Sequence, residues 1–252
     1  MTTPQTRQTA KDALRRTLAD HAGDTKHKAV MAAIQDLVQL NPTSAPARNA
    51  ALRDGNWLLI NAPNFPDGEL QADGRHLYTL GRLAFNMFQP KTLKVAIDRV
   101  FQPILPIDDT QRTHDIWVDF TIADDAVPPL KGVVRNLGVC QPYSDDSLQV
   151  RFTGGVLTPQ QDTDLEAWKQ VFGNQTRASR TVRTPLKERL KGFFLKLMFG
   201  LVSPEGMNPG TGEVSFTMKR SPKGTLQILY LDEELRITKG ERGTVLVCDR
   251  QD

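Results

Sequence analysis

The chain has 252 residues, of which 39% are hydrophobic, and its formal net charge is +3. This length can bury a full hydrophobic core, and all-β barrels commonly reach it as one domain. No stretch approaches the ~18 consecutive apolar residues of a transmembrane helix, which excludes a protein that spans a membrane by helices. The small net charge does not by itself indicate a nucleic-acid-binding protein, and we expect none.

Residue types that commonly act in catalysis or metal binding are few, and they are far apart in the sequence. Cys140 and Cys248 are far apart and have no CxxC neighbour, which argues against a zinc site and against a disulfide framework. The four histidines lack HxH or HxxxH spacing, so we expect no metal. Paired acidic residues lie beside turn signals, where Asp bonds its own backbone, and no GxSxG or phosphate loop is present. The sequence therefore predicts no enzyme and no cofactor.

Two helices are expected at the start of the chain, over residues 9–22 and 26–40. In the second, Val30, Ile34 and Leu37 recur at helical spacing. This spacing gives the helix one apolar face to bury.

The chain changes character after the second helix. Asn41-Pro42 ends the helix, and a segment rich in Pro and Ser follows, which is typical of a linker. We therefore expect an N-terminal helical extension of residues 1–42 and a main domain of residues 43–252. The first eight residues lack the apolar run of a secretory signal, and we expect an unprocessed cytoplasmic protein.

Strand patterns dominate the middle of the chain. Short apolar runs with period-2 alternation predict strands, and Pro and Gly clusters such as Gln102-Pro103 separate them. The expected strands cover residues 55–61, 93–101, 115–122, 132–140, 148–153 and 212–220. Residues 77–88 fit a short helix or a strand equally well, because their apolar residues are dense.

One helix interrupts these strands. It is expected over residues 162–171, with Asp162 or Thr163 as its N-cap and Gly173 as its terminator.

The positive charge of the chain lies in one segment. Between Thr176 and Leu201, seven basic residues accompany one acidic residue, so this segment carries +6 and the remainder of the chain −3.

Within this segment, residues 184–201 predict a basic amphipathic helical insertion. Its apolar stripe is Leu186, Leu190, Phe193, Phe194, Leu197, Met198 and Leu201, and the basic residues off the stripe are Lys187, Arg189, Lys191 and Lys196. Such a helix suits the surface of an anionic membrane, where each basic residue contributes ~1 kcal/mol, so this insertion is the expected membrane contact. The alternatives are a movable lid, or a helix that packs on the sheet.

Three short alternating runs between Lys223 and Arg250 predict a β-meander that closes the sheet. The side chains expected to share a face within each run are Leu226, Ile228 and Tyr230, then Leu235 and Ile237, then Val245 and Val247. Acidic and Gly-containing turns separate the runs, because Gly tolerates positive backbone angles and Asp bonds its own backbone.

Gly55-x-Trp57 on the first strand and Arg236 near the end form a further pair. In small up-and-down barrels of the lipocalin type, such a Trp packs across the barrel floor and a late Arg lies over its ring, a contact of ~0.5–2 kcal/mol. The alternative is an ordinary core Trp and a solvated Arg. With eight or nine strands expected, the fold class is mainly β with helical additions, a lipocalin-like antiparallel β-barrel that can enclose one small ligand.

Both ends of the main domain resemble a known family. The chain resembles a plastid lipid-associated protein, or fibrillin, at two places. The first is Asn41-Pro42-Thr43 with Pro46, followed by residues 52–59 (LRDGNWLL). The second is residues 230–237 (YLDEELRI), followed by residues 240–247 (GERGTVLV). The resemblance to this PAP/fibrillin family covers roughly residues 30–250 and is looser in the middle. The lack of a clear transit peptide fits a cyanobacterial member better than a plant precursor.

The resemblance implies a function. The family is lipocalin-like and non-enzymatic, is associated with thylakoids and plastoglobules, and is implicated in binding or storing isoprenoids, carotenoids, quinones and fatty acids. It implies a hydrophobic small-molecule ligand and a peripheral place on thylakoids or lipid droplets, or in the plastid stroma and plastoglobules for a plant protein. The family's motif positions fall on Trp57, Tyr230, Asp232 and Arg236, as residues of a ligand site or of the barrel closure.

Two other functions stay open. A scaffold that uses its N-terminal helices to recruit an enzyme of isoprenoid or quinone metabolism predicts a filled barrel, whereas ligand binding predicts a cavity. An isomerase or cyclase acting on an oxidised lipid would require polar residues that converge inside the barrel.

Overall fold

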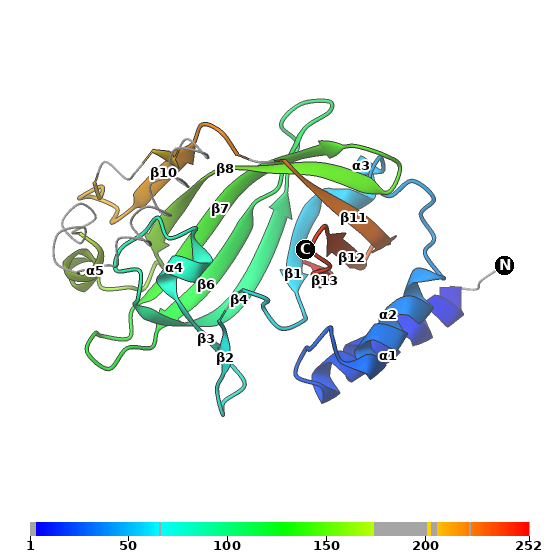
Figure 1. The fold of residues 1–252 in the computed structure, drawn as a ribbon, viewed down its shortest axis with the longest axis horizontal. Coiled ribbons are helices and arrows are strands. Elements are labelled where there is room, and N and C mark those ends of the chain that lie inside the picture. Colours follow the sequence, from blue (N-terminus) through cyan, green and yellow to red (C-terminus); the bar gives the residue numbers. More distant parts are fainter. Residues whose placement is uncertain (1–3, 66, 174–200, 203–205, 222, 252) are drawn as a thin grey trace.

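The computed structural model describes residues 4–65, 67–173, 201–202, 206–221 and 223–251 (Figure 1). The amphipathic insertion expected over residues 184–201 lies outside these ranges apart from Leu201, which begins a short strand instead of ending a helix. All the expected membrane-contact residues therefore lie outside the described residues.

Eight antiparallel strands hydrogen-bond to one another in a closed ring, because β1 pairs with both β4 and β13 (Figure 1). In ring order they are β1 (Gly55–Leu59), β4 (Lys94–Ile104), β6 (Ile116–Ile122), β7 (Lys131–Pro142), β8 (Ser147–Pro159), β11 (Gly224–Leu231), β12 (Leu235–Gly240) and β13 (Val245–Gln251). The expected mainly antiparallel β fold is confirmed at this level.

Shorter elements attach to the ring. The added strands are β2 (Glu69–Leu70), β3 (His76–Thr79), β5 (Arg112–Thr113), β9 (Leu201–Val202) and β10 (Val214–Met218), and the helices are α1 (Pro4–Asp20), α2 (Lys28–Val38), α3 (Ala50–Arg53), α4 (Leu80–Leu83) and α5 (Leu165–Phe172). None of the described helices is long and apolar enough to cross a membrane.

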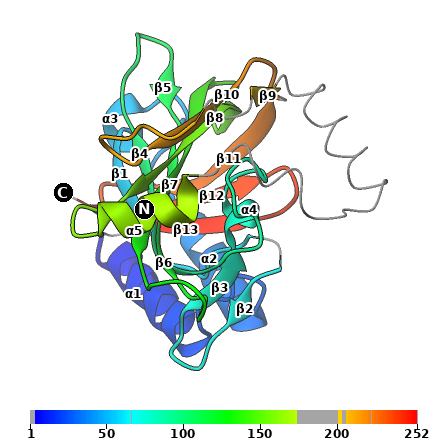
Figure 2. The same ribbon diagram turned by 90° about the vertical axis from the view of Figure 1, so that its left-hand side faces the viewer.

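Helices α1 and α2 lie side by side against the outside of the ring (Figures 1 and 2). Their apolar faces, which include Leu14 and Ile34, share one buried cluster with Tyr230, Ile237 and Val247 of the meander. Strand β12 is therefore buried on both faces, since Leu235 and Ile237 face the helices while Arg236 and Thr238 alternate with them. The helices cover the meander.

The inside of the ring holds two further clusters that run into each other. One contains Trp57 and side chains from β4, β7, β8, β11 and β13. The other lies on β4, β6, β7, β8 and β10 beneath α4 and α5, and Leu59 packs against both. Strand β7 spans the two, because every second residue from Gly132 to Cys140 is buried.

The structure corrects one face assignment in the meander. Ile228 pairs with Thr238 and Tyr230 with Ile237, so Leu229 is an extra residue in a β-bulge. Because the bulge shifts the period-2 alternation, Ile228 lies in the cluster inside the ring and Tyr230 in the cluster under the helices. The faces expected for the other two runs of the meander are confirmed.

Element boundaries also differ from expectation. Pro103 does not end β4, which continues to Ile104, because β4 pairs with β1 through Pro103 and Ile104. Residues 77–88 contain both alternatives, since β3 runs directly into α4. Asp164 caps α5 in place of Asp162 or Thr163, because its carboxylate reaches the backbone N–H groups of the first turn.

Candidate functional site

Trp57 and Arg236, paired in the sequence analysis, meet inside the ring. Trp57 is fully buried, its indole Nε1 donates to the carbonyl oxygen of Arg53 at 2.9 Å, and the Arg236 guanidinium lies 4.8 Å from its ring centroid. Arg250, which pairs with Trp57 on β13, lies 4.6 Å from the same ring. The expected cation–π contact is present, with a second arginine that the sequence did not indicate.

The structure shows why the Gly-x-Trp motif has a glycine at position 55. Its φ is +144°, a region that side chains rarely adopt, and a Cβ there would lie 2.6 Å from Nη1 of Arg250. The glycine therefore leaves room for the arginine that packs on Trp57.

A buried group of polar side chains surrounds this pair, and we call it the interior polar cluster. Its members come from six different segments and are Arg53, Gln102, His114, Cys140, Arg236 and Cys248. Arg236 donates to Gln102 Oε1 and contacts the Cys248 thiol, and both Arg53 and Arg236 act electrostatically on Cys140. Strands from across the ring thus bring these groups together.

Burial fixes the charge states of this cluster. It lowers the pKa of His114 to about 3, with a further contribution from the charge of Arg236, so the imidazole is neutral at pH 7. It also raises the pKa of Cys140 and of Cys248, which keeps both thiols protonated. Burial lowers the pKa of Arg53 and of Arg236, but a guanidinium starts so high that it stays charged.

The interior polar cluster is therefore rich in hydrogen-bond donors and poor in nucleophiles or bases. A protonated thiol is a weak nucleophile, and an imidazole with a pKa of about 3 is a weak base at neutral pH. The described residues also contain no group of three His, Cys, Asp or Glu side chains that suits a metal ion. The arrangement fits recognition of an acceptor group better than acid–base or metal chemistry.

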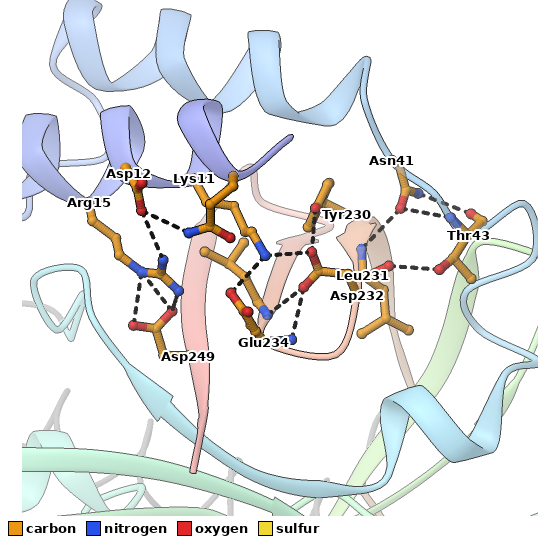
Figure 3. A network of polar contacts seen from close by, with 12 residues as sticks. Lys11, Asp12, Arg15, Asn41, Thr43, Tyr230, Leu231, Asp232, Glu234 and Asp249 are labelled. Carbon is orange, nitrogen blue, oxygen red and sulfur yellow. Dashed lines mark hydrogen bonds and ion pairs between the residues drawn. The ribbon is translucent and has the colours of Figure 1, made fainter. Parts of the chain in front are cut away.

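Tyr230 and Asp232, the other two motif residues, lie on the helix-covered side of the meander (Figure 3). Tyr230 Oη donates to Asp232 Oδ2 at 2.6 Å, and Lys11 Nζ of α1 donates to the same oxygen at 3.0 Å. Asp232 Oδ1 accepts the backbone N–H groups of Glu234 and Leu235 in the β11–β12 turn. This carboxylate joins α1 to the meander and does not face the inside of the ring.

The pKa values of the side chains in this network are also shifted. Burial raises the pKa of Asp232, but hydrogen bonds from Tyr230, from the turn and from Lys11 outweigh it and lower the pKa overall. Burial lowers the pKa of Lys11, and its bonds to Glu234 and Asp232 outweigh that effect. Burial and the bond to Asp232 raise the pKa of Tyr230.

The N-terminal motif meets the C-terminal motif at β11. Asn41 Oδ1 accepts the backbone N–H of Leu231 at 3.2 Å, and Thr43 Oγ1 donates to the Leu231 carbonyl oxygen at 2.7 Å (Figure 3). Two sequence motifs thus form one contact between residues that are 190 positions apart in the chain.

A surface pocket of about 180 Å³ is lined by residues of strands β7 and β8, together with Gln111 and Lys223. Its lining residues are polar or basic apart from Val139 and Cys140, and they are Gln111, Val139, Cys140, Gln141, Gln149, Arg151 and Lys223. It is smaller than the roughly 300–1,000 Å³ typical of ligand sites. This pocket does not provide the enclosed apolar space expected for an isoprenoid.

Arg53, Gln102, His114 and Arg250 were missed in the sequence analysis. Gln102 was read as part of a break between strands, and Arg53 lies in a short helix that the pattern did not indicate. For Arg53 and Arg250, the sequence offered one indication, which is that each lies next to one of the two family motifs.

The PAP_fibrillin family model matches residues 9–249 of this chain. The chain is 25% identical over 249 residues to plastid lipid-associated protein 3, chloroplastic, of Brassica campestris, covering 93% of this chain and 60% of that protein. It is 25% identical over 232 residues to probable plastid-lipid-associated protein 3, chloroplastic, of Arabidopsis thaliana, covering 90% of this chain and 53% of that protein. The chain therefore spans less than two thirds of these relatives. No solved structure matches it.

Proposed function

This chain belongs to the PAP/fibrillin family, and from that premise we propose that it binds or stores a hydrophobic small molecule at lipid surfaces. The ligand classes are isoprenoids, carotenoids, quinones and fatty acids. The relatives are chloroplastic lipid-associated proteins by name, which supports a lipid-related role in a photosynthetic setting.

The observation that carries the proposal is the apolar cluster that lies inside the strand ring beneath α4 and α5. We regard the ring as a lipocalin-like barrel, with the two inner clusters as its ligand-facing lining. Their side chains are almost fully buried, so ligand entry requires a covering element to move. Helix α4 is the proposed entry point, because Phe85 directly after it is 43% exposed and rests on Phe152. The ligand gains roughly 25 cal/mol of binding free energy for each Å² of its apolar surface that is withdrawn from water.

Docking on the membrane is assigned to the basic segment of residues 184–201. The protein is then peripheral on thylakoids or lipid droplets, with the apolar stripe in the interface and the lysines and arginines near anionic head groups. Replacing Phe193 and Phe194 by alanine should reduce co-flotation with anionic liposomes several-fold. The matched control is Leu105→Ala with Ile107→Ala, which also removes two large apolar side chains, both of them exposed, from another part of the chain.

Lipid extraction tests the ligand proposal. Protein purified from a photosynthetic host should release a stoichiometric lipid or pigment that mass spectrometry identifies. A protein that carries no lipid and takes none up from liposomes would contradict the proposal.

A scaffold is the second candidate, and two observations favour it. The lining of the ring is filled by its own side chains, and α1 is held to the meander by Lys11 and Arg15 through ion pairs on its inner side. On this account the outer side of α1 and α2 recruits an enzyme. Losing a copurifying enzyme on charge reversal of exposed α1 residues, while lipid uptake is unchanged, would favour the scaffold.

Catalysis is not part of the proposal, although polar residues do converge inside the ring. Both cysteines are held as thiols and His114 is neutral, which leaves the interior polar cluster without an activated group.

A further inference from the structure

The surface pocket on strands β7 and β8 is lined by two cations without a counter-charge. Arg151 and Lys223 are both exposed, and within the described part of the chain neither side chain makes a hydrogen bond or an ion pair. Lys223 directly precedes Gly224, which pairs with Val150, so the lysine lies beside Arg151 on the neighbouring strand. Like charges that face each other across two strands are destabilising. A bound anion would relieve this repulsion.

The pocket lies on the outer face of the sheet. Val139 pairs with Arg151, and Gln141 pairs with Gln149. Cys140, between Val139 and Gln141, belongs to a cluster inside the ring. Because successive side chains of a strand point to opposite faces, the side chains of the two pairs point outward. The pocket is therefore separate from the lipid site proposed inside the ring, and an inference about it does not depend on that site.

A β-bulge gives this face its hollow. The pairing of β7 with β8 shifts between Leu137 and Gly138, which leaves Thr153 as an extra residue in β8. A bulge bends the strand that contains it and increases the local twist. The sheet is thus bent close to Arg151, and this bend provides a local cause for a pocket on an otherwise continuous face.

Three glutamine side chains complete the lining with hydrogen-bond donors. Arg112 pairs with Cys140, which places Gln111 beside Gln141, and Gln149 lies opposite Gln141 on β8. In the described ranges none of these three amide side chains has a hydrogen bond. Each amide carries two N–H donors, and the lysine and arginine add three and five. Four neighbouring segments thus present unused donors to one pocket.

The acidic residues that precede these glutamines in the sequence are already bound. Asp108 Oδ1 accepts the backbone N–H of Gln111 at 2.7 Å and that of Thr110 at 2.8 Å. Asp146 Oδ1 accepts the hydroxyl groups of Ser144 and Ser147. Both carboxylates are held in their own turns, so they leave the charge of the pocket positive.

We propose that this pocket binds a phosphate monoester group, with Arg151 and Lys223 balancing its charge and the glutamine amides donating to its oxygens. Such a group carries ~1.5–2 negative charges at pH 7 and three strong acceptor oxygens, which matches two cations and several donors. A carboxylate has one charge and two oxygens, and would leave part of both unmatched. The volume of about 180 Å³ suits a small group, since sites for larger ligands start at roughly 300 Å³. The phosphate belongs to a soluble ester or to a lipid head group, which share this chemistry.

The first test compares two soluble anions on the unaltered protein. Binding of glycerol 3-phosphate and of acetate is measured by isothermal calorimetry at pH 8 and constant ionic strength. Glycerol 3-phosphate should bind at least about tenfold more tightly, because it forms more charge-assisted hydrogen bonds. Equal affinity for the two anions, or no binding of glycerol 3-phosphate at millimolar concentration, would overturn the proposal.

The second test removes the two cations. Arg151→Gln with Lys223→Gln should weaken binding of glycerol 3-phosphate at least about tenfold. The matched control is Arg16→Gln with Lys28→Gln, which removes the same charge from exposed positions on α1 and α2 and should change the affinity less than about twofold. Unchanged affinity in the pocket variant, or an equal loss in the control, would overturn the site.

Thermal unfolding establishes that the pocket variant is folded. We expect its midpoint to match that of the unaltered protein without ligand, because neither side chain has a partner to lose among the described residues. If the midpoint falls, Lys223→Gln alone decides, with an expected loss of affinity of about threefold.

Vesicles distinguish the two sources of the phosphate. Co-flotation is measured with phosphatidylcholine vesicles that contain phosphatidic acid, a monoester, or phosphatidylglycerol, a diester, at equal surface charge. A preference for phosphatidic acid that the pocket variant loses supports the site and assigns it to a head group. Equal co-flotation with both vesicles, together with binding of glycerol 3-phosphate that depends on Arg151 and Lys223, supports the site and assigns it to a soluble ester.

Discussion

Asp232 joins helix α1 to the β11–β12 turn. It holds the β11–β12 turn through two backbone N–H groups, and it accepts hydrogen bonds from Tyr230 and from Lys11 of α1. The sequence motif therefore marks a structural junction at this position, whereas Trp57 and Arg236 mark the inside of the ring.

Replacing Asp232 by alanine should lower the free energy of unfolding by roughly 3 kcal/mol. Lys11 is buried and would keep only Glu234, and the backbone N–H groups of Glu234 and Leu235 would lose their common acceptor, Asp232 Oδ1. Tyr230→Phe removes one hydrogen bond of the same network and should cost only about 1 kcal/mol. Urea denaturation measures both values, and equal small losses would show that the network adds little.

His114 should make the protein sensitive to acid. Its pKa is about 3 in the folded protein and 6.5 in the unfolded chain, so between these values the unfolded state binds the proton and the folded state does not. Stability is therefore retained above pH 6.5 and is lost progressively as the pH falls toward 3.

The free energy of unfolding measured from pH 7 to pH 4 tests this. The slope over this range should be shallower in His114→Gln than in the unaltered protein. Met31→Ala on α2, which changes no titratable group and removes an exposed side chain, should retain the original slope. Identical slopes in all three proteins would show that His114 does not titrate as described.

Helices α1 and α2 are an integral part of the described fold, because their apolar faces share a cluster with three strands of the meander. The division at residues 42 and 43 stays a prediction.

The variant Leu14→Ala tests whether the helix pair unfolds together with the strand ring. Leu14 is fully buried, and its truncation should cost about 2–5 kcal/mol in a single cooperative transition. Met31→Ala on α2 is the control, because Met31 is 46% exposed and its loss should cost under about 0.5 kcal/mol. An early separate transition in Leu14→Ala would show that the helices unfold independently of the ring.

Whole elements of the molecule were predictable where a local pattern determines them. The alternation in residues 115–122 predicted β6, and the Gly-x-Trp motif with the late arginine predicted a contact across the ring. The bulge at Leu229 was not predictable, because it depends on how β11 pairs with β12. One such extra residue moves Tyr230 from the inside to the outside.

The interior polar cluster was not predictable for a related reason. Its members come from six segments, and nothing local distinguishes a buried Gln102 or His114 from an exposed one. Only the tertiary fold shows that Arg236 is buried and donates to Gln102.

The proposed function places a lipid inside the strand ring of the whole molecule. Photo-crosslinking with a palmitic acid that carries a diazirine in mid-chain, followed by peptide mass spectrometry, locates the bound lipid. We expect adducts on the inner face of β7, near Val134 and Asn136, and on Trp168, and we expect them to be lost in competition with excess palmitate. Adducts confined to the outer surface of the ring or to residues 184–201 would contradict it.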